Sequence, residues 1–164
     1  MLKVKVIERG PLDEKVKQAR QIYKGALQDG VRLWHRTMLP GHFVPQEQFA
    51  AKYGAAIPGG YVKRSAKYLK RKAILFGHRR NLEFRGEMKR NVLTQLVVSG
   101  TANKATGRLP GSQKANFKRS AAAPNMRMEL VVTLFEENQR LAEFVEALIA
   151  RELNSNQPVK VTNI

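Results

Sequence analysis

The sequence VKQARQIYKGALQDGVRLW, residues 16–34, decides the fold because its apolar residues recur at every third or fourth position. This spacing places them along one side of an α-helix. Pro11 is suited to the first turn of that helix, and Pro40-Gly41 cannot continue it. We therefore predict one long amphipathic helix over residues 12–38.

The rest of the chain predicts two more helices and several short strands. Residues 61–76 repeat apolar residues at helical spacing, and Gly77 is suited to the C-cap. Thr133 and Glu136 have the capping-box form, which predicts a helix running to about Leu153. Consecutive strands joined by tight turns favour an antiparallel sheet. The predicted fold class is therefore α+β, in which a long N-terminal helix and a C-terminal helix pack against a small antiparallel β-sheet. The expected strands cover residues 2–7, 92–99, 104–109 and 127–132.

The length of 164 residues fits one domain, which we place at residues 1–153, followed by a flexible tail at 154–164. Two long loops are expected inside it, an extended loop over 39–60 with one helical turn at 46–52 and an exposed loop over 110–124. Loops of this length are uncommon in compact domains and are usually functional. We expect the aromatic residues of the first loop, Phe43, Phe49 and Tyr53, to dock onto a neighbouring subunit. The expected core residues are Trp34, Leu69, Phe84 and Phe144.

Basic residues are concentrated in the middle of the chain. Residues 50–128 hold eighteen Lys and Arg and two acidic residues, Glu83 and Glu87, and so carry +16 of the net charge of +17. Such a concentration destabilises an isolated monomer by self-repulsion and requires a partner of opposite sign. Charge alone favours nucleic acid and acidic protein, such as the final helix of a neighbouring copy, about equally. The candidate contact residues are Lys63, Arg64, Lys67, Lys70, Arg71, Lys72, Arg79 and Arg80.

Residue patterns for catalysis or cofactor binding are not found. The sequence has no cysteine, and His35, His42 and His78 have no neighbouring acidic residues that would complete a metal site. No nucleophile triad, phosphate-binding loop or zinc-finger pattern occurs. We therefore expect no catalytic residue, no cofactor and no metal. We also expect neither a signal peptide nor a membrane span, because no apolar run approaches the roughly 18 residues that a span needs.

Several segments in a fixed order resemble a family of tailed-bacteriophage virion proteins, the small head–tail joining or tail-completion proteins of the neck. The resemblance covers roughly residues 30–98. Arg85 and Glu87-Met88 depart from the family pattern, which has threonine before the glycine and then a basic–leucine pair. The segments are LWHR (33–36), LPGHF (39–43), AKYG (51–54), YLKRKA (68–73), FGH (76–78) and LEFRGEMKR (82–90).

The resemblance implies a non-enzymatic structural protein of the virion, assembled in the cytoplasm of a bacterial host. Copies would form a homo-oligomeric ring in the neck, between the portal-bound connector and the tail, with extended loops clasping neighbours. Its partners would be adjacent portal, connector and tail proteins, with non-specific contact to packaged DNA as a secondary expectation and no membrane contact. The alternatives are a stand-alone basic nucleic-acid-binding protein and, more weakly, a ribosome-associated basic protein.

Overall fold

A computed structural model describes residues 11–80, 82–83, 86–110, 112 and 126–155. The fold is α+β, as the sequence predicts: one two-stranded antiparallel sheet and several helices make up the described part of the chain. The expected strand at 2–7, most of the loop at 110–124, Phe84 and residues 156–164 of the tail lie outside the described residues. The elements are α1 (Pro11–Thr37), η1 (Leu39–His42), α2 (Gln46–Tyr53), η2 (Gly54–Ala56), α3 (Ala66–Phe76), α4 (Glu87–Thr94), β1 (Val97–Thr101), β2 (Lys104–Arg108), α5 (Met126–Val131) and α6 (Phe135–Ser155).

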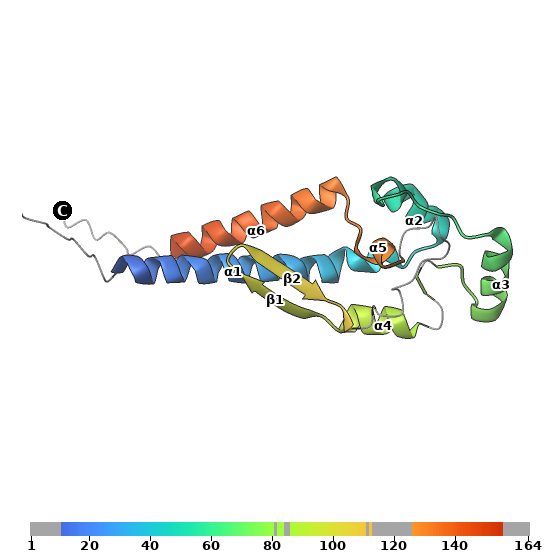
Figure 1. The fold of residues 1–164 in the computed structure, drawn as a ribbon, viewed down its shortest axis with the longest axis horizontal. Coiled ribbons are helices and arrows are strands. Elements are labelled where there is room, and N and C mark those ends of the chain that lie inside the picture. The colour runs from blue at the N-terminus through green and yellow to red at the C-terminus, as the bar shows by residue number, and fades with distance from the viewer. Residues whose placement is uncertain (1–10, 81, 84–85, 111, 113–125, 156–164) are drawn as a thin grey trace, which may run out of the picture.

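Helix α1 runs along the long axis of an elongated molecule (Figure 1). Helix α6 lies along it, and the β1–β2 hairpin packs against it as well. Helices α2, α3, α4 and α5 gather around the C-terminal end of α1, and α3 lies at the extreme end of the molecule. The predicted helix at 12–38 is confirmed, because α1 covers nearly the same residues.

Two glycines allow the elements to approach α1 closely. A Cβ atom on Gly30 would lie 2.8 Å from Cγ2 of Val145 on α6. A Cβ atom on Gly107 of β2 would lie 2.7 Å from Cγ1 of Val31 on α1. Real Cβ atoms do not approach other heavy atoms so closely, so both positions are restricted to glycine unless the packing shifts.

The expected hairpin between the second and third strands is confirmed, with Val97 paired to Arg108 and Thr101 to Lys104, and its turn lies at residues 102–103 because β1 extends to Thr101. The strand prediction for 92–99 is wrong over its first half, because α4 extends to Thr94. Val92 is fully buried, and Met88, one helical turn earlier, packs against the same core cluster. Burial at this spacing favours a helix over the β-propensity of valine.

The strand predicted at 127–132 is also wrong, because Met126–Val131 forms helix α5. Its buried side chains, Met126, Glu129 and Leu130, follow helical spacing. The capping prediction for the next helix is displaced by one residue: the carboxylate of Glu137 accepts a hydrogen bond from the backbone N–H of Leu134 at 3.2 Å. Helix α6 therefore begins at Phe135, and Glu137 rather than Glu136 satisfies a backbone donor at its start.

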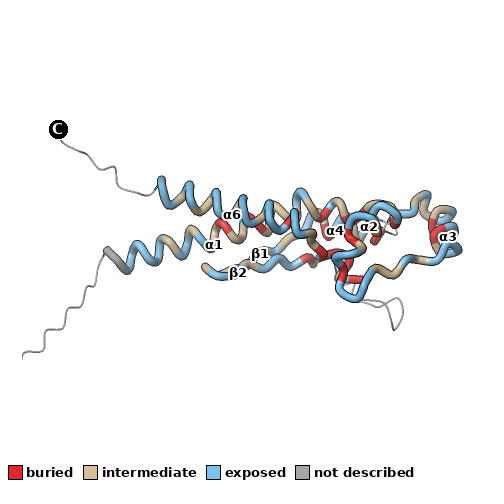
Figure 2. Tube along the Cα trace, turned by 90° about the horizontal axis from the view of Figure 1, so that it is seen from above, coloured by how far each residue is buried: buried red, intermediate tan, exposed pale blue. Residues whose placement is uncertain are grey.

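The buried residues gather at the end of the molecule that holds α2, α4 and α5, whereas the opposite ends of α1 and α6 are largely exposed (Figure 2). Of the predicted core residues, Leu69 is buried, Trp34 packs partly buried against the first core cluster, and Phe144 is half-buried. The first core cluster is Leu39, Phe43, Leu82, Val92, Leu109, Met126 and Leu130. The second is Phe49, Tyr53, Ile57 and Val132.

The segment at 39–60 is therefore part of the core. The prediction that Phe43, Phe49 and Tyr53 dock onto a neighbouring subunit is contradicted, because all three side chains are buried within this chain. The helical turn expected at 46–52 is confirmed as α2, and two short 3-10 helices occupy much of the remaining segment that was expected to be irregular. Apolar contact with α5 and with Val132 and Leu134, which join α5 to α6, orders the segment.

Candidate interaction surface

Helix α3 carries the basic cluster that the sequence singles out. The hydroxyl of Ser65 accepts a hydrogen bond from the backbone N–H of Tyr68 at 3.2 Å and so caps its N-terminus. Gly77 ends the helix in the left-handed conformation, with φ of 71°, which confirms the predicted C-cap. No acidic residue lies in the first turn, where Lys67 is placed instead. A cation at the positive end of the helix dipole is unfavourable, so its position there is not explained by helix stability.

The structure separates the six basic residues of 63–72 into two groups. Lys63, Lys67, Lys70 and Arg71 are exposed, whereas Arg64 and Lys72 are directed inward. Sequence periodicity could not make this division, because charged residues stand on both sides of the helix. Only the exposed four are available to a partner.

Arg64 holds the start of α3 against the rest of the molecule. Its guanidinium lies 3.2 Å from the buried carboxylate of Glu129 on α5 and donates to the hydroxyl of Tyr61 at 2.8 Å. Its backbone N–H donates to the side chain of Gln46 on α2 at 2.6 Å. A buried, hydrogen-bonded ion pair of this kind positions the chain, since the loss of either partner leaves an unpaired charge out of water.

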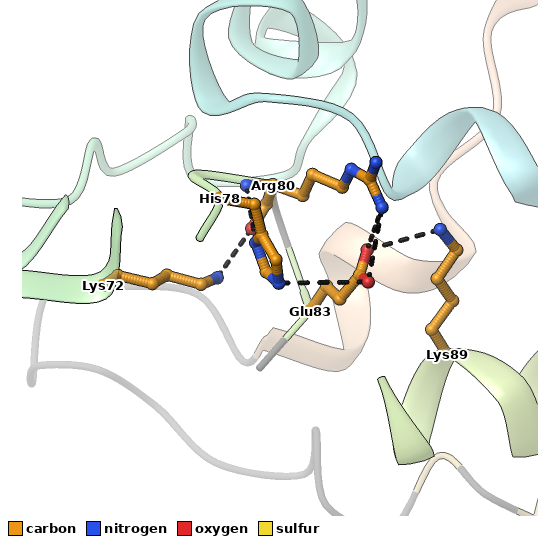
Figure 3. Close-up of polar contacts among 5 residues, drawn as sticks. All are labelled: Lys72, His78, Arg80, Glu83 and Lys89. Atoms are coloured by element: carbon orange, nitrogen blue, oxygen red, sulfur yellow. Dashed lines mark hydrogen bonds and ion pairs between the residues drawn. The ribbon is translucent and has the colours of Figure 1, made fainter. Parts of the chain in front are cut away.

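Lys72 is buried, and its ammonium donates to the backbone carbonyl of Arg80 at 2.6 Å (Figure 3). Burial lowers the pKa of Lys72 from 10.5 to about 8, and the charge of Arg64 adds to this effect, whereas Glu83 opposes it. The prediction that Lys72 contacts another subunit or DNA is therefore not supported by its position. The ammonium instead ties α3 to the turn that follows it.

Glu83 forms ion pairs with His78 and Arg80, which precede it in the turn after α3, and with Lys89 of α4, which follows it in the chain (Figure 3). Its carboxylate lies 3.3 Å from the ammonium of Lys89, 3.5 Å from the guanidinium of Arg80 and 3.9 Å from the ring of His78. One buried carboxylate thus offsets a part of the positive charge in the middle of the chain. Arg80 is partly committed to this contact, while Arg79 is exposed.

A second polar network lies between α2 and α6. Glu137 accepts a hydrogen bond from the hydroxyl of Tyr53 at 2.9 Å and pairs with Lys52 at 3.0 Å. Burial by itself raises the pKa of Glu137, but the hydrogen bonds from Lys52, Leu134 and Tyr53 outweigh it and hold the pKa below its usual value. Glu83, Glu129 and Glu137 are buried within this chain. The partners of Glu129 and Glu137 are distant in sequence, whereas Arg80 and Lys89 lie close to Glu83 along the chain.

The histidines contribute to packing. His42 is fully buried among Trp34, Phe49 and Tyr53, and its Nδ1 lies 3.0 Å from the backbone carbonyl of Glu129. Burial lowers the pKa of His42, and so favours the neutral ring. Within the described residues, no group of three or more His, Cys, Asp or Glu is arranged to hold a metal ion, and no helix is long and apolar enough to cross a membrane.

The outer side of α3 is apolar as well as basic. Ile74 is 76 % exposed and Leu75 is 59 % exposed, and both follow the exposed cations along the helix. These two large aliphatic side chains are exposed to solvent at the end of the molecule that α3 occupies. Comparison of the chain with protein-family models, curated proteins and solved structures found no match.

Proposed function

We propose that this protein is a structural component of a tailed-bacteriophage virion, a neck or tail-completion protein that forms an oligomeric ring joining the portal-connector of the capsid to the tail. It works by binding other protein subunits and catalyses no reaction. The family resemblance of residues 30–98 supports the location in the neck. The observation that carries the binding role is the exposed Ile74 and Leu75 beside Lys67, Lys70 and Arg71 on the outer side of α3.

A protein partner accounts for this surface better than nucleic acid does. Phosphate groups recognise cations but gain nothing from large aliphatic side chains, whereas protein interfaces combine an apolar centre with a charged rim. The buried state of Arg64 and Lys72 also removes two cations from the surface that DNA could reach.

The test is the state of the purified protein in solution and in negative stain. The proposal predicts rings of uniform size, and a mass in light scattering that is a multiple of the 18.5 kDa chain. A monomer at every concentration, with no rings in the images, would contradict the proposed ring.

A stand-alone nucleic-acid-binding function remains the second candidate, because Lys63, Lys67, Lys70 and Arg71 are exposed close together. Electrophoretic binding across a salt series distinguishes the two. Tight binding of DNA or RNA by a monomer, with affinity that falls steeply as salt rises, would favour the second candidate.

A further inference from the structure

The outer side of α3 carries a continuous set of exposed basic and aliphatic side chains. Helical geometry places Lys67, Arg71 and Ile74 in one row along the helix, with Lys70 and Leu75 on either side of that row. All five side chains are exposed. The opposite side of α3 holds the buried residues Leu69 and Lys72, so this row faces directly away from the molecule. We call these five residues the α3 outer face.

Helix α6 presents a surface of opposite charge. Its half-buried side, which includes Leu141, Val145 and Leu148, lies toward α1. The opposite side carries the exposed acidic residues and the exposed Arg140, and an exposed apolar residue precedes them: Phe135 is 78 % exposed. We define the α6 outer face as Phe135, Glu136, Glu143 and Glu146, all of them exposed.

The two surfaces also match in the order of their residues. Ile74 follows Lys67 by seven residues, about 10 Å along a helix, and Glu143 follows Phe135 by eight, about 12 Å. When the two helices run antiparallel, Ile74 lies against Phe135 while the cations of α3 lie against the carboxylates of α6. Each surface thus places an apolar side chain at one end and charge along the rest.

We propose that the α3 outer face of one copy docks antiparallel onto the α6 outer face of the next copy, and that this contact joins the subunits of the ring. The inference deepens the proposed function and rests on it. The two faces lie on different parts of an elongated molecule, with α3 at one extreme end (Figures 1 and 2). Such a contact between two different surfaces is heterologous, and it closes into a ring when the rotation between copies is suitable.

Charge reversal on each face tests the contact. The first variant changes Lys67, Lys70 and Arg71 to Glu, and the second changes Glu136, Glu143 and Glu146 to Lys. Either variant alone places like charges opposite each other, so the affinity between copies falls by more than about tenfold. A control variant, in which the exposed Lys15, Lys17 and Arg20 of α1 become Glu, has the same net charge as the first and retains association.

Complementation makes the test specific. An equimolar mixture of the two variants restores association, because the acidic α3 of one now meets the basic α6 of the other. A single chain carrying both sets of changes also self-associates. Circular dichroism and thermal melting of each variant establish that it is folded before its association is measured.

The outcomes distinguish the inference from the proposed function. Rings formed by each single variant as readily as by the wild-type protein would overturn the α3–α6 contact and leave the ring itself in place. Loss of rings in both variants without recovery in the mixture would also overturn it, since another surface must then join the subunits. A wild-type protein that forms no ring would contradict the proposed function first.

Discussion

The guanidinium of Arg64 lies 3.2 Å from the carboxylate of Glu129, and the two side chains are 6 % and 0 % exposed. The pair joins the residue just before the cap of α3 to the middle of α5, across 65 positions of sequence. It fixes the base of the helix that presents the exposed cations. A residue that resembles a surface contact in the sequence is therefore a buried structural element.

Replacement of Arg64 by Ala is expected to lower the free energy of unfolding by about 3–5 kcal/mol, because the carboxylate of Glu129 is then buried without its charged partner. Chemical denaturation measures the change. Arg32 is the matched control: it pairs with Asp29 at 2.6 Å, but the side chains are 55 % and 50 % exposed. Arg32→Ala should cost about 0–1 kcal/mol. Equal effects of the two replacements would show that Arg64 is solvated in the folded protein.

The buried ammonium of Lys72 should make stability depend on alkaline pH. Its pKa is about 8 in the folded chain and 10.5 in the unfolded chain, so between these values the unfolded chain holds a proton that the folded chain lacks. Stability therefore rises with pH over this window, and the penalty of burying the charge is fully present below it.

Lys72→Met isolates this effect, because the substituted side chain does not titrate. From about pH 7.5 to about pH 9.5 the wild-type protein should gain about 2 kcal/mol of stability relative to Lys72→Met. The exposed Lys17 of α1, which lies outside the proposed α3–α6 contact, serves as the control and is changed to Met in the same way. A constant difference between wild type and Lys72→Met across the window would mean that Lys72 titrates normally.

The hydroxyl of Tyr53 donates to Glu137 at 2.9 Å inside the second core cluster. Tyr53→Phe keeps the ring but removes this donor, and should lower the free energy of unfolding by about 1.5–3 kcal/mol, the usual range for a hydrogen bond to a charged group. Tyr23 is exposed on α1, so Tyr23→Phe should leave stability unchanged. Thermal and chemical denaturation of both variants check the comparison.

Gly25 and Gly30 of α1 should respond in opposite directions to replacement by Ala. A Cβ atom at Gly25 meets nothing within 4 Å, so Gly25→Ala should stabilise the protein by about 1 kcal/mol through helix propensity. A Cβ atom at Gly30 would lie 2.8 Å from the stiff side chain of Val145. Gly30→Ala should therefore destabilise by about 1–3 kcal/mol through overpacking. A stabilising Gly30→Ala would show that α6 lies farther from α1.

Local patterns predicted the elements that depend on local chemistry. The long repeat of residues 16–34 predicts α1, and Gly77 is confirmed as the end of α3 because its left-handed conformation suits glycine. The hairpin of β1 and β2 is confirmed too, with its turn at 102–103. The failures at 92–94 and 127–131 share one cause: short segments rich in Val, Leu and Met fit a strand or a helix equally well, and their burial against distant residues decides between them.

The candidate surface was only partly predictable for a similar reason. The sequence located the basic cluster of residues 63–72, but it could not distinguish the exposed Lys70 and Arg71 from the buried Arg64 and Lys72. For Arg64 the distinction depends on Glu129, which lies far along the chain, and for Lys72 on the turn that brings the carbonyl of Arg80 back to α3. The aromatic residues of 39–60 were misassigned in the same way, because their packing partners lie on α5 and in the segment that joins α5 to α6.

The sequence by itself determined the long helix α1 and the concentration of positive charge in residues 50–128. Periodicity and charge are properties of neighbouring residues, so they can be read without coordinates. Only the tertiary structure decided which cations remain exposed, which carboxylates are buried with them, and that the aromatic segment belongs to the core. These outcomes depend on contacts between distant residues, since burial makes an unpaired charge costly and an apolar contact favourable.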